Sequence, residues 1–159
     1  MTYTYNNERH KQLVKRYLDL KNQGKSLSIE NDQAFSELSK YDSTVAQQIY
    51  WAHREEFIKA IKNLLTRNID FDKFEGTFLY IYWTTNREAK LSQRDLKQIE
   101  KFEPEPSAEL EEFYSVVYCI LRALETVDDG YSSKQEVIDY IKETCLRYKI
   151  LKDEIDIWT

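Results

Sequence analysis

The sequence predicts an all-α protein: an antiparallel helical bundle with a four-helix-like core and an N-terminal helical extension. Glycine and proline, with 3 and 2 residues among 159, are too rare for a chain built from many turns. Such a composition favours helices joined by short loops over a sandwich or barrel. Apolar residues also recur at spacings of three and four along most segments, which is the period of a helix with one buried face.

The N-terminal extension, residues 1–41, is predicted to hold one clear helix. It spans residues 8–23, carries Leu13, Val14, Tyr17 and Leu20 on one side, and ends at Gly24. The region 26–40 predicts a weaker, short helix that begins near Asn31 or Asp32. The polar run 39–43 is expected to be a loop.

The bundle itself, residues 42–151, is predicted to begin with the longest helix, over residues 44–67. Asn68 is expected to end this helix in the left-handed conformation. Asp70 then caps a helix that reaches about Trp83, followed by a polar loop over 84–90. Gly76 lies inside this second helix, where glycine is unfavourable, so we expect it to mark a close contact with a neighbour.

Two proline residues form a corner at residues 102–106, after a short helix that a Ser92/Asp95 capping box opens and Lys101 ends. Ser107 is the expected N-cap of the next helix, whose stripe of apolar residues runs on to Asp128, Asp129 and Gly130. For the final helix both Ser132/Gln135 and Ser133/Glu136 fit a capping box. Residues 152–159 form a short C-terminal tail.

Charge is spread unevenly along the chain. The net charge is −5 overall, but residues 1–67 carry +3 and residues 68–159 carry −8. The segment 98–132 holds nine acids against Lys101 and Arg122. A field of this sign repels nucleic acid and attracts basic partners, and the alternative explanation is a solubilising face.

The two cysteines, Cys119 and Cys145, fall in predicted apolar helices, where buried free thiols are the ordinary outcome. They do not make a secreted disulfide framework. The sequence shows neither a signal peptide nor an apolar run of about 20 residues, the length that a membrane span needs. We therefore expect no membrane association and a reducing compartment, either the cytoplasm or a plastid stroma.

Residues that carry catalytic or metal chemistry are scarce. Neither His10 nor His53 has a glutamate three residues before it, as a di-iron helical bundle requires. Asp70, Asp72 and Gly76 only partly match a calcium loop, because Phe74 stands where an oxygen ligand belongs. We therefore predict no enzyme, no catalytic residue, no metal, no cofactor and no small-molecule substrate.

Three short sequence motifs follow one another along the chain. They are Tyr50-Trp51-Ala52-His53-Arg54-Glu55-Glu56-Phe57-Ile58, then Ile69-Asp70-Phe71-Asp72-Lys73-Phe74-Glu75, then Phe102-Glu103-Pro104-Glu105-Pro106. In this order they resemble the bacterial self-protective colicin-like immunity family of the colicin D type. The resemblance covers about residues 42–150 and is greatest to divergent members from plastid and cyanobacterial genomes.

The resemblance implies a bacteriocin immunity protein: a helical bundle that binds and inhibits a toxin, a basic nuclease that cuts transfer RNA. Such an inhibitor acts by placing carboxylates where the substrate places phosphates, with Phe113 or Tyr114 as aromatic anchors. The acidic segment supplies the expected partner-binding residues, which are Glu103, Glu105, Glu109, Glu111, Glu112, Asp128 and Asp129.

Two alternatives remain open from the sequence. The first is a non-enzymatic interaction or structural protein that dimerises through the aromatic-rich run 78–83. The second is an RNA-binding module built on Lys15, Arg16, Lys21 and Lys25 of the first helix. We expect no direct binding of nucleic acid, because the rest of the chain is acidic.

Overall fold

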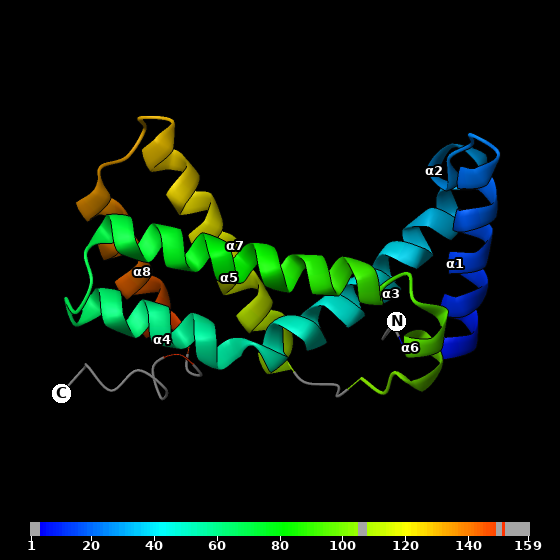
Figure 1. The fold of residues 1–159 in the computed structure, drawn as a ribbon, viewed down its shortest axis with the longest axis horizontal. Helices are drawn as coiled ribbons and strands as arrows, with labels where there is room; N and C mark the ends of the chain where they lie inside the picture. Colours follow the sequence, from blue (N-terminus) through cyan, green and yellow to red (C-terminus); the bar gives the residue numbers. More distant parts are fainter. Residues whose placement is uncertain (1–3, 105–107, 149–150, 152–159) are drawn as a thin grey trace. The chain divides into compact units, whose positions relative to one another are not determined.

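A computed structural model describes residues 4–104, 108–148 and 151, and in this part of the chain all regular structure is helical (Figure 1). The predicted all-α fold class is confirmed. The helices are α1 (Asn7–Asn22), α2 (Leu27–Glu30), α3 (Asp32–Ala52), α4 (Arg54–Leu65), α5 (Phe71–Ser92), α6 (Leu96–Lys101), α7 (Ala108–Asp128) and α8 (Lys134–Arg147).

The chain divides into two compact units. Unit 1 comprises residues 1–49 and 87–106, and unit 2 comprises residues 50–86 and 107–159. The unit boundaries fall inside α3 and α5, so they differ from the predicted division at residue 41. That division followed the order of the sequence, whereas segments far apart in the sequence pack together here.

Unit 1 has its own hydrophobic core, in which α1 packs against α2 and α6. The buried side chains are Leu13, Val14, Leu27, Ala34, Leu38, Tyr41 and Ile99. The side chain of Asn7 donates hydrogen bonds to the carbonyl oxygens of Ile99 and Phe102, at 2.7 and 2.6 Å. These bonds satisfy carbonyl groups at the end of α6 and fix the start of the proline corner.

Unit 2 is built around aromatic rings, with α8 packed against α4 and α7. Phe57 of α4 contacts Phe78 of α5 and Phe113 of α7, with ring centroids 5.4 and 6.0 Å apart. All three rings are fully buried. Edge-to-face packing of this kind adds about 0.5–1.5 kcal/mol per pair to the free energy gained by burial.

Two predicted loops are helical in the structure, so these predictions are wrong. The run 39–43 lies within α3, where Tyr41 is buried, and the run 84–90 lies within α5, where Thr85 and Ala89 are buried. The hydroxyl of Thr84 donates to the carbonyl oxygen of Tyr80 at 2.8 Å. Small and polar side chains thus extend the buried faces of α3 and α5, and hydroxyl groups can donate to backbone carbonyl oxygens of their own helix.

The predicted helix over residues 44–67 is interrupted at His53. Helix α3 ends at Ala52 and α4 begins at Arg54, with His53 in a turn between them. The His53 ring lies 2.6 Å from a carboxylate oxygen of Glu56 in the first turn of α4. The polar residues around His53 therefore mark the point where one helix ends and the next begins. The sequence prediction missed this break because apolar residues recur at helical spacing on both sides of it.

Helix ends are largely as predicted. Gly24 and Gly130 both have positive φ, and Asp70 caps α5 by accepting from the N–H of Lys73 at 2.8 Å. The capping box at α8 uses Ser133 and Glu136. The prediction that Asn68 adopts the left-handed conformation is wrong, because Arg67, with φ 61°, is the residue that adopts it.

Helix α6 is capped by Asp95, whose carboxylate accepts from two backbone N–H groups. Ser92 ends α5 and takes no part in this cap, so the predicted Ser92/Asp95 box is wrong. Ser107 lies outside the described residues.

The expectation that Gly76 marks a close contact is also wrong. A Cβ atom built at this position meets nothing within 4 Å, and Gly76 is exposed.

Candidate functional site

The predicted partner-binding acids lie at three places. Glu103 is exposed in the corner after α6, in unit 1, and Glu105 lies outside the described residues. The other five acids lie at the two ends of α7 and are exposed. Glu109 and Glu111 stand in its first turn and Glu112 follows directly, whereas Asp128 and Asp129 stand at its other end, about 27 Å from Glu111 to Asp129 at 1.5 Å per residue.

Helix α7 places some of these acids on one face and turns the others away. Glu111 and Asp129 are 18 residues apart, which is about five turns, so their side chains leave the helix in nearly the same direction. The Asp129 N–H still donates to the carbonyl oxygen of Glu125 at 3.0 Å, which extends the helical path to this residue. Glu125 also projects within about 40° of that direction. We call Glu111, Glu125 and Asp129 the acid stripe.

The remaining α7 acids point elsewhere. Helical geometry turns Glu109 and Glu112 by about 100° or more from the acid stripe, and it turns Asp128 by about 100° from Glu111 and Asp129 and about 60° from Glu125. The predicted set therefore does not form a single cluster, and Glu125, which belongs to the stripe, was missed. The apolar residues of α7 define its buried face, and the helical period then gives the residues on the opposite, exposed face. This reasoning would have found Glu125 from the sequence.

Asp128 lies in a separate group of charges at the end of α7. Burial, together with the carboxylates of Asp128 and Asp72, raises the pKa of Glu75. Lys134 offsets part of this charge, with its ammonium group 2.9 Å from a carboxylate oxygen of Asp72. This group of charges thus interacts largely with itself.

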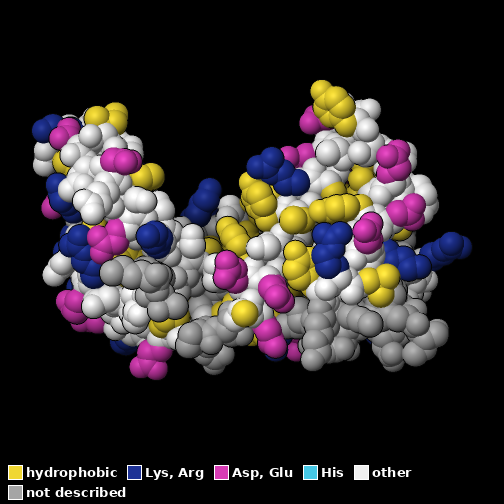
Figure 2. Space-filling view, turned by 180° about the vertical axis from the view of Figure 1, so that it is seen from behind, with side chains coloured by type: hydrophobic (Ala, Val, Ile, Leu, Met, Phe, Trp, Pro, Cys, Tyr) yellow, Lys and Arg dark blue, Asp and Glu magenta, His cyan; other side chains and the backbone are white. Residues whose placement is uncertain are grey.

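An apolar groove lies between α7 and α8 beside the acid stripe. It has a volume of about 540 Å³, and Tyr118, Cys119, Ala123, Val137 and Tyr140 form most of its lining. Tyr118 and Tyr140 are 46% and 39% exposed, which is unusual for rings that flank an apolar hollow. Figure 2 shows hydrophobic side chains gathered on the face of unit 2 that is turned to the viewer.

Arg122 is the single base of α7, and it is held against the groove by Tyr118. Its guanidinium group lies 5.1 Å from the centre of the Tyr118 ring and donates to the Tyr118 hydroxyl at 3.0 Å. The hydrogen bond to Tyr118 raises the pKa of Arg122. The expected anchors Phe113 and Tyr114 cannot take this outward role, since Phe113 is buried and Tyr114 packs on Tyr50.

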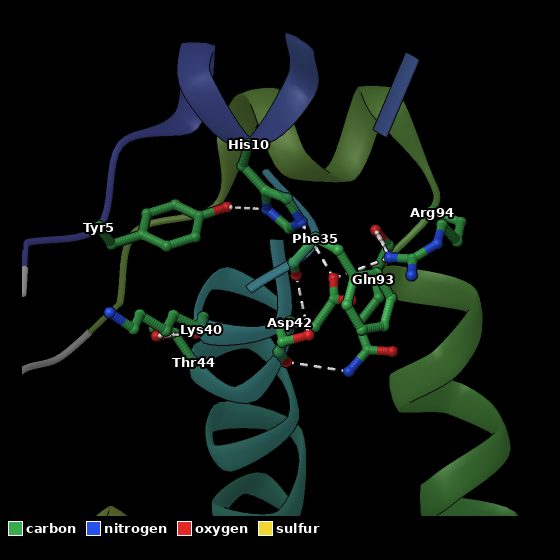
Figure 3. A network of polar contacts seen from close by, with 9 residues as sticks. Tyr5, His10, Phe35, Lys40, Asp42, Thr44, Gln93 and Arg94 are labelled. Carbon is green, nitrogen blue, oxygen red and sulfur yellow. Dashed lines mark hydrogen bonds and ion pairs between the residues drawn. The ribbon is translucent and has the colours of Figure 1, made fainter. Parts of the chain in front are cut away.

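Unit 1 contains a polar network around a buried histidine (Figure 3). The Tyr5 hydroxyl lies 2.7 Å from His10 Nδ1, and His10 Nε2 lies 3.3 Å from Asp42 Oδ1. The same Asp42 oxygen accepts from Arg94 at 2.7 Å, and Gln93 donates to the Asp42 carbonyl oxygen. Buried polar groups are stable only when such partners satisfy them.

The chemistry of this network is structural. Burial and the Asp42 carboxylate raise the pKa of Tyr5, so the phenol keeps its proton and donates it to Nδ1. His10 then carries its proton on Nε2 and donates to Asp42. A group that acts as an acid or a nucleophile needs a lowered or near-neutral pKa, which is the opposite of what Tyr5 shows. No pattern in the sequence indicated that His10 lies in a core.

Within the described residues, no group of three or more His, Cys, Asp and Glu side chains is placed to hold a metal ion. In the same part of the chain, no helix is both long and apolar enough to cross a membrane. Fold and site together define an all-helical protein with an acidic, aromatic-edged surface on α7. Comparisons with family models, curated proteins and solved structures find no match for this chain.

Proposed function

We propose that this protein is a non-enzymatic binding protein that captures a basic protein partner through the exposed face of α7. The resemblance to colicin-like immunity proteins makes the partner class a tRNA-cleaving nuclease toxin, and the chain would be its inhibitor. The proposal assigns no catalytic residue and no cofactor. It rests on the surface of one helix and on the three short motifs.

The acid stripe is the observation that supports this proposal most directly. Helix α7 carries five acids against one base, and its outer face presents Glu111, Glu125 and Asp129 along about 27 Å. The single base, Arg122, stands on the same outer face between Glu111 and Glu125, where it donates to the Tyr118 hydroxyl. A long surface on which acids outnumber bases three to one raises the association rate with an oppositely charged partner and suppresses wrong partners.

The test is inhibition of tRNA cleavage by the nuclease domain of a colicin D type toxin. The wild-type chain is expected to inhibit cleavage, and the triple variant E111K/E125K/D129K is expected to associate at least about tenfold more slowly at low ionic strength. Added salt should narrow this difference, because exposed charges are screened.

A matched control separates local charge from net charge. The variant D19K/E30K/E55K reverses three exposed acids outside α7 and changes the net charge by the same amount. It should inhibit nearly as well as the wild type. Failure of the wild type to inhibit would refute the toxin assignment, and equal losses in both variants would refute the role of the acid stripe.

A second candidate function is self-association through α5. Within the aromatic-rich run 78–83, Tyr80 and Trp83 are 70% and 63% exposed, whereas Phe78 is buried. Exposed aromatic pairs are typical of interfaces. Sedimentation of the wild type and of Y80S/W83S tests it: a dimer that the variant loses would support this function, and a monomeric wild type would exclude it.

A further inference from the structure

The α7–α8 groove has the composition of a site that takes apolar side chains. Its lining surface is mostly apolar, although Arg122, Thr126, Ser132 and Glu136 also line it, and its volume of about 540 Å³ exceeds what one large side chain fills. Tyr118 and Tyr140 stand at its edges with hydroxyl groups that reach water. Apolar hollows with a few polar groups at the edge are where ligands and partner side chains bind.

Charge around the groove selects among possible occupants. Glu136 lines the groove at the start of α8, and Glu125 and Asp129 of the acid stripe stand three residues beyond the lining residues Arg122 and Thr126. Arg122 is the one base in the described lining, where it contacts the Tyr118 ring and hydroxyl, and the three acids outnumber it. The surroundings therefore favour an occupant that combines apolar and basic groups, and they disfavour an anion.

A second copy of the chain fits this groove poorly if it binds through the same face. Two-fold symmetry would place one acid stripe against another, so Glu111, Glu125 and Asp129 would meet like charges. Like charges facing each other across an interface are costly. This argument disfavours a two-fold dimer through this face and favours an occupant of the opposite charge.

We infer that the α7–α8 groove binds a basic amphipathic helix of the partner, whose apolar stripe enters the groove while its lysines and arginines face the acid stripe. The inference rests on the proposed function and adds where the partner's apolar contacts are made. Helix-in-groove binding supplies such contacts at spacings of three and four residues. The acid stripe would govern the rate of association, and the groove would govern the lifetime of the complex.

The probe is a synthetic helical peptide with leucine at positions i, i+3, i+4 and i+7 and lysine elsewhere. Amide chemical-shift changes on the intact protein should map to α7 and α8 around Tyr118, Ala123 and Tyr140. A peptide of the same composition with the leucines scattered should bind at least about tenfold more weakly, because it cannot fill the groove. Shift changes elsewhere, or equal binding of the two peptides, would overturn the inference.

Two groove variants act without changing charge. A123W fills the hollow and Y140S removes one wall, and each should weaken binding of the amphipathic peptide at least about tenfold at high salt. L146S is the matched control, since it removes an exposed apolar side chain of α8 outside the groove. It should bind as the wild type does. Two groove variants, A123W and Y140S, are used so that loss of folding in one of them does not decide the test. Circular dichroism would detect unfolding of either variant.

The same variants separate this inference from the proposed function. If A123W and Y140S both inhibit the nuclease domain as well as wild type while E111K/E125K/D129K fails, the groove inference is overturned and the proposed function stands. If the charge variant inhibits normally, the proposed function is overturned. Equal binding of a glutamate-for-lysine peptide would also overturn the groove inference, as would a dimer that buries the groove.

Discussion

Replacing Tyr5 with phenylalanine removes one oxygen atom from the buried network of unit 1. The ring of Tyr5 packs edge-on against His10, Tyr41 and Phe102, with centroids 5.6, 5.4 and 5.1 Å away. Phenylalanine keeps all three contacts. The only loss is the hydrogen bond to His10 Nδ1, which leaves a polar nitrogen on a side chain that is fully buried.

The expected cost follows from that orphaned nitrogen. A buried polar group without a partner costs about 1–3 kcal/mol, more than the net value of an ordinary hydrogen bond. For a chain of this size each kcal/mol lowers Tm by about 2–4 °C. Neither tautomer of His10 avoids the loss, because a proton moved to Nδ1 would have no acceptor there and would break the hydrogen bond from Nε2 to Asp42, which would keep only Arg94 as its donor.

Urea denaturation followed by circular dichroism measures the effect. Y131F is the control, because Tyr131 is 84% exposed and its hydroxyl is solvated; its change should stay within about 0.5 kcal/mol. The double variant Y5F/H10L should be less destabilised than the sum of its two single variants, since removing both partners leaves no orphan. If Y5F and Y131F proved equally stable, the account of the network would be wrong.

Three further predictions concern single residues of unit 2. G76A should raise the free energy of unfolding by about 0.5–1 kcal/mol, because alanine is the better helix former and its methyl group meets open space; a destabilised G76A would reveal a contact. E75Q should stabilise the protein at pH 7 and have little effect near pH 3. The folded state binds more protons than the unfolded state as pH rises above about 4.5, so ionisation of Glu75 lowers stability; a gain that does not depend on pH would contradict this. Iodoacetamide should modify the half-buried Cys119 first, because burial raises the pKa of Cys145 to about 12; mass spectrometry that finds Cys145 labelled first in the folded protein would be inconsistent with its burial.

Helix starts were predictable from the sequence because local chemistry determines them. Asp70 and Ser133 cap helices in the structure as their side chains predict, and Gly24 and Gly130 end helices with positive φ. These interactions involve residues three or four positions apart, so no knowledge of distant contacts is needed.

Helix interiors that bury small or polar residues were not predictable in the same way. Thr85 and Ala89 of α5 are 1% exposed, yet neither residue type signals a core by itself. Tertiary packing decides their burial, and packing overrides weak local preference. His10 is the same case at a polar residue, since its place in the core depends on Tyr5 and Asp42, a donor and an acceptor from other segments.

For the candidate site, the sequence predicted that α7 is acidic, but it did not predict the directions in which the acidic side chains leave the helix. The buried face, which includes Phe113, Val117, Ile120 and Leu124, is read readily from the apolar period. Once that face is fixed, every acid on the helix has a fixed direction as well, which divides the predicted set and adds Glu125. The groove required α8, a separate element, and no pattern within α7 indicates which helix packs beside it.

The two properties of α7 depend on each other physically. A helix with seven buried apolar residues is held rigidly by its core, so its exposed acids keep their spacing without a partner. Preorganised charge loses little conformational entropy on binding, whereas the same acids on a loop would first have to be ordered. The packing that makes α7 a core helix would therefore also preorganise its outer face for the basic partner proposed above.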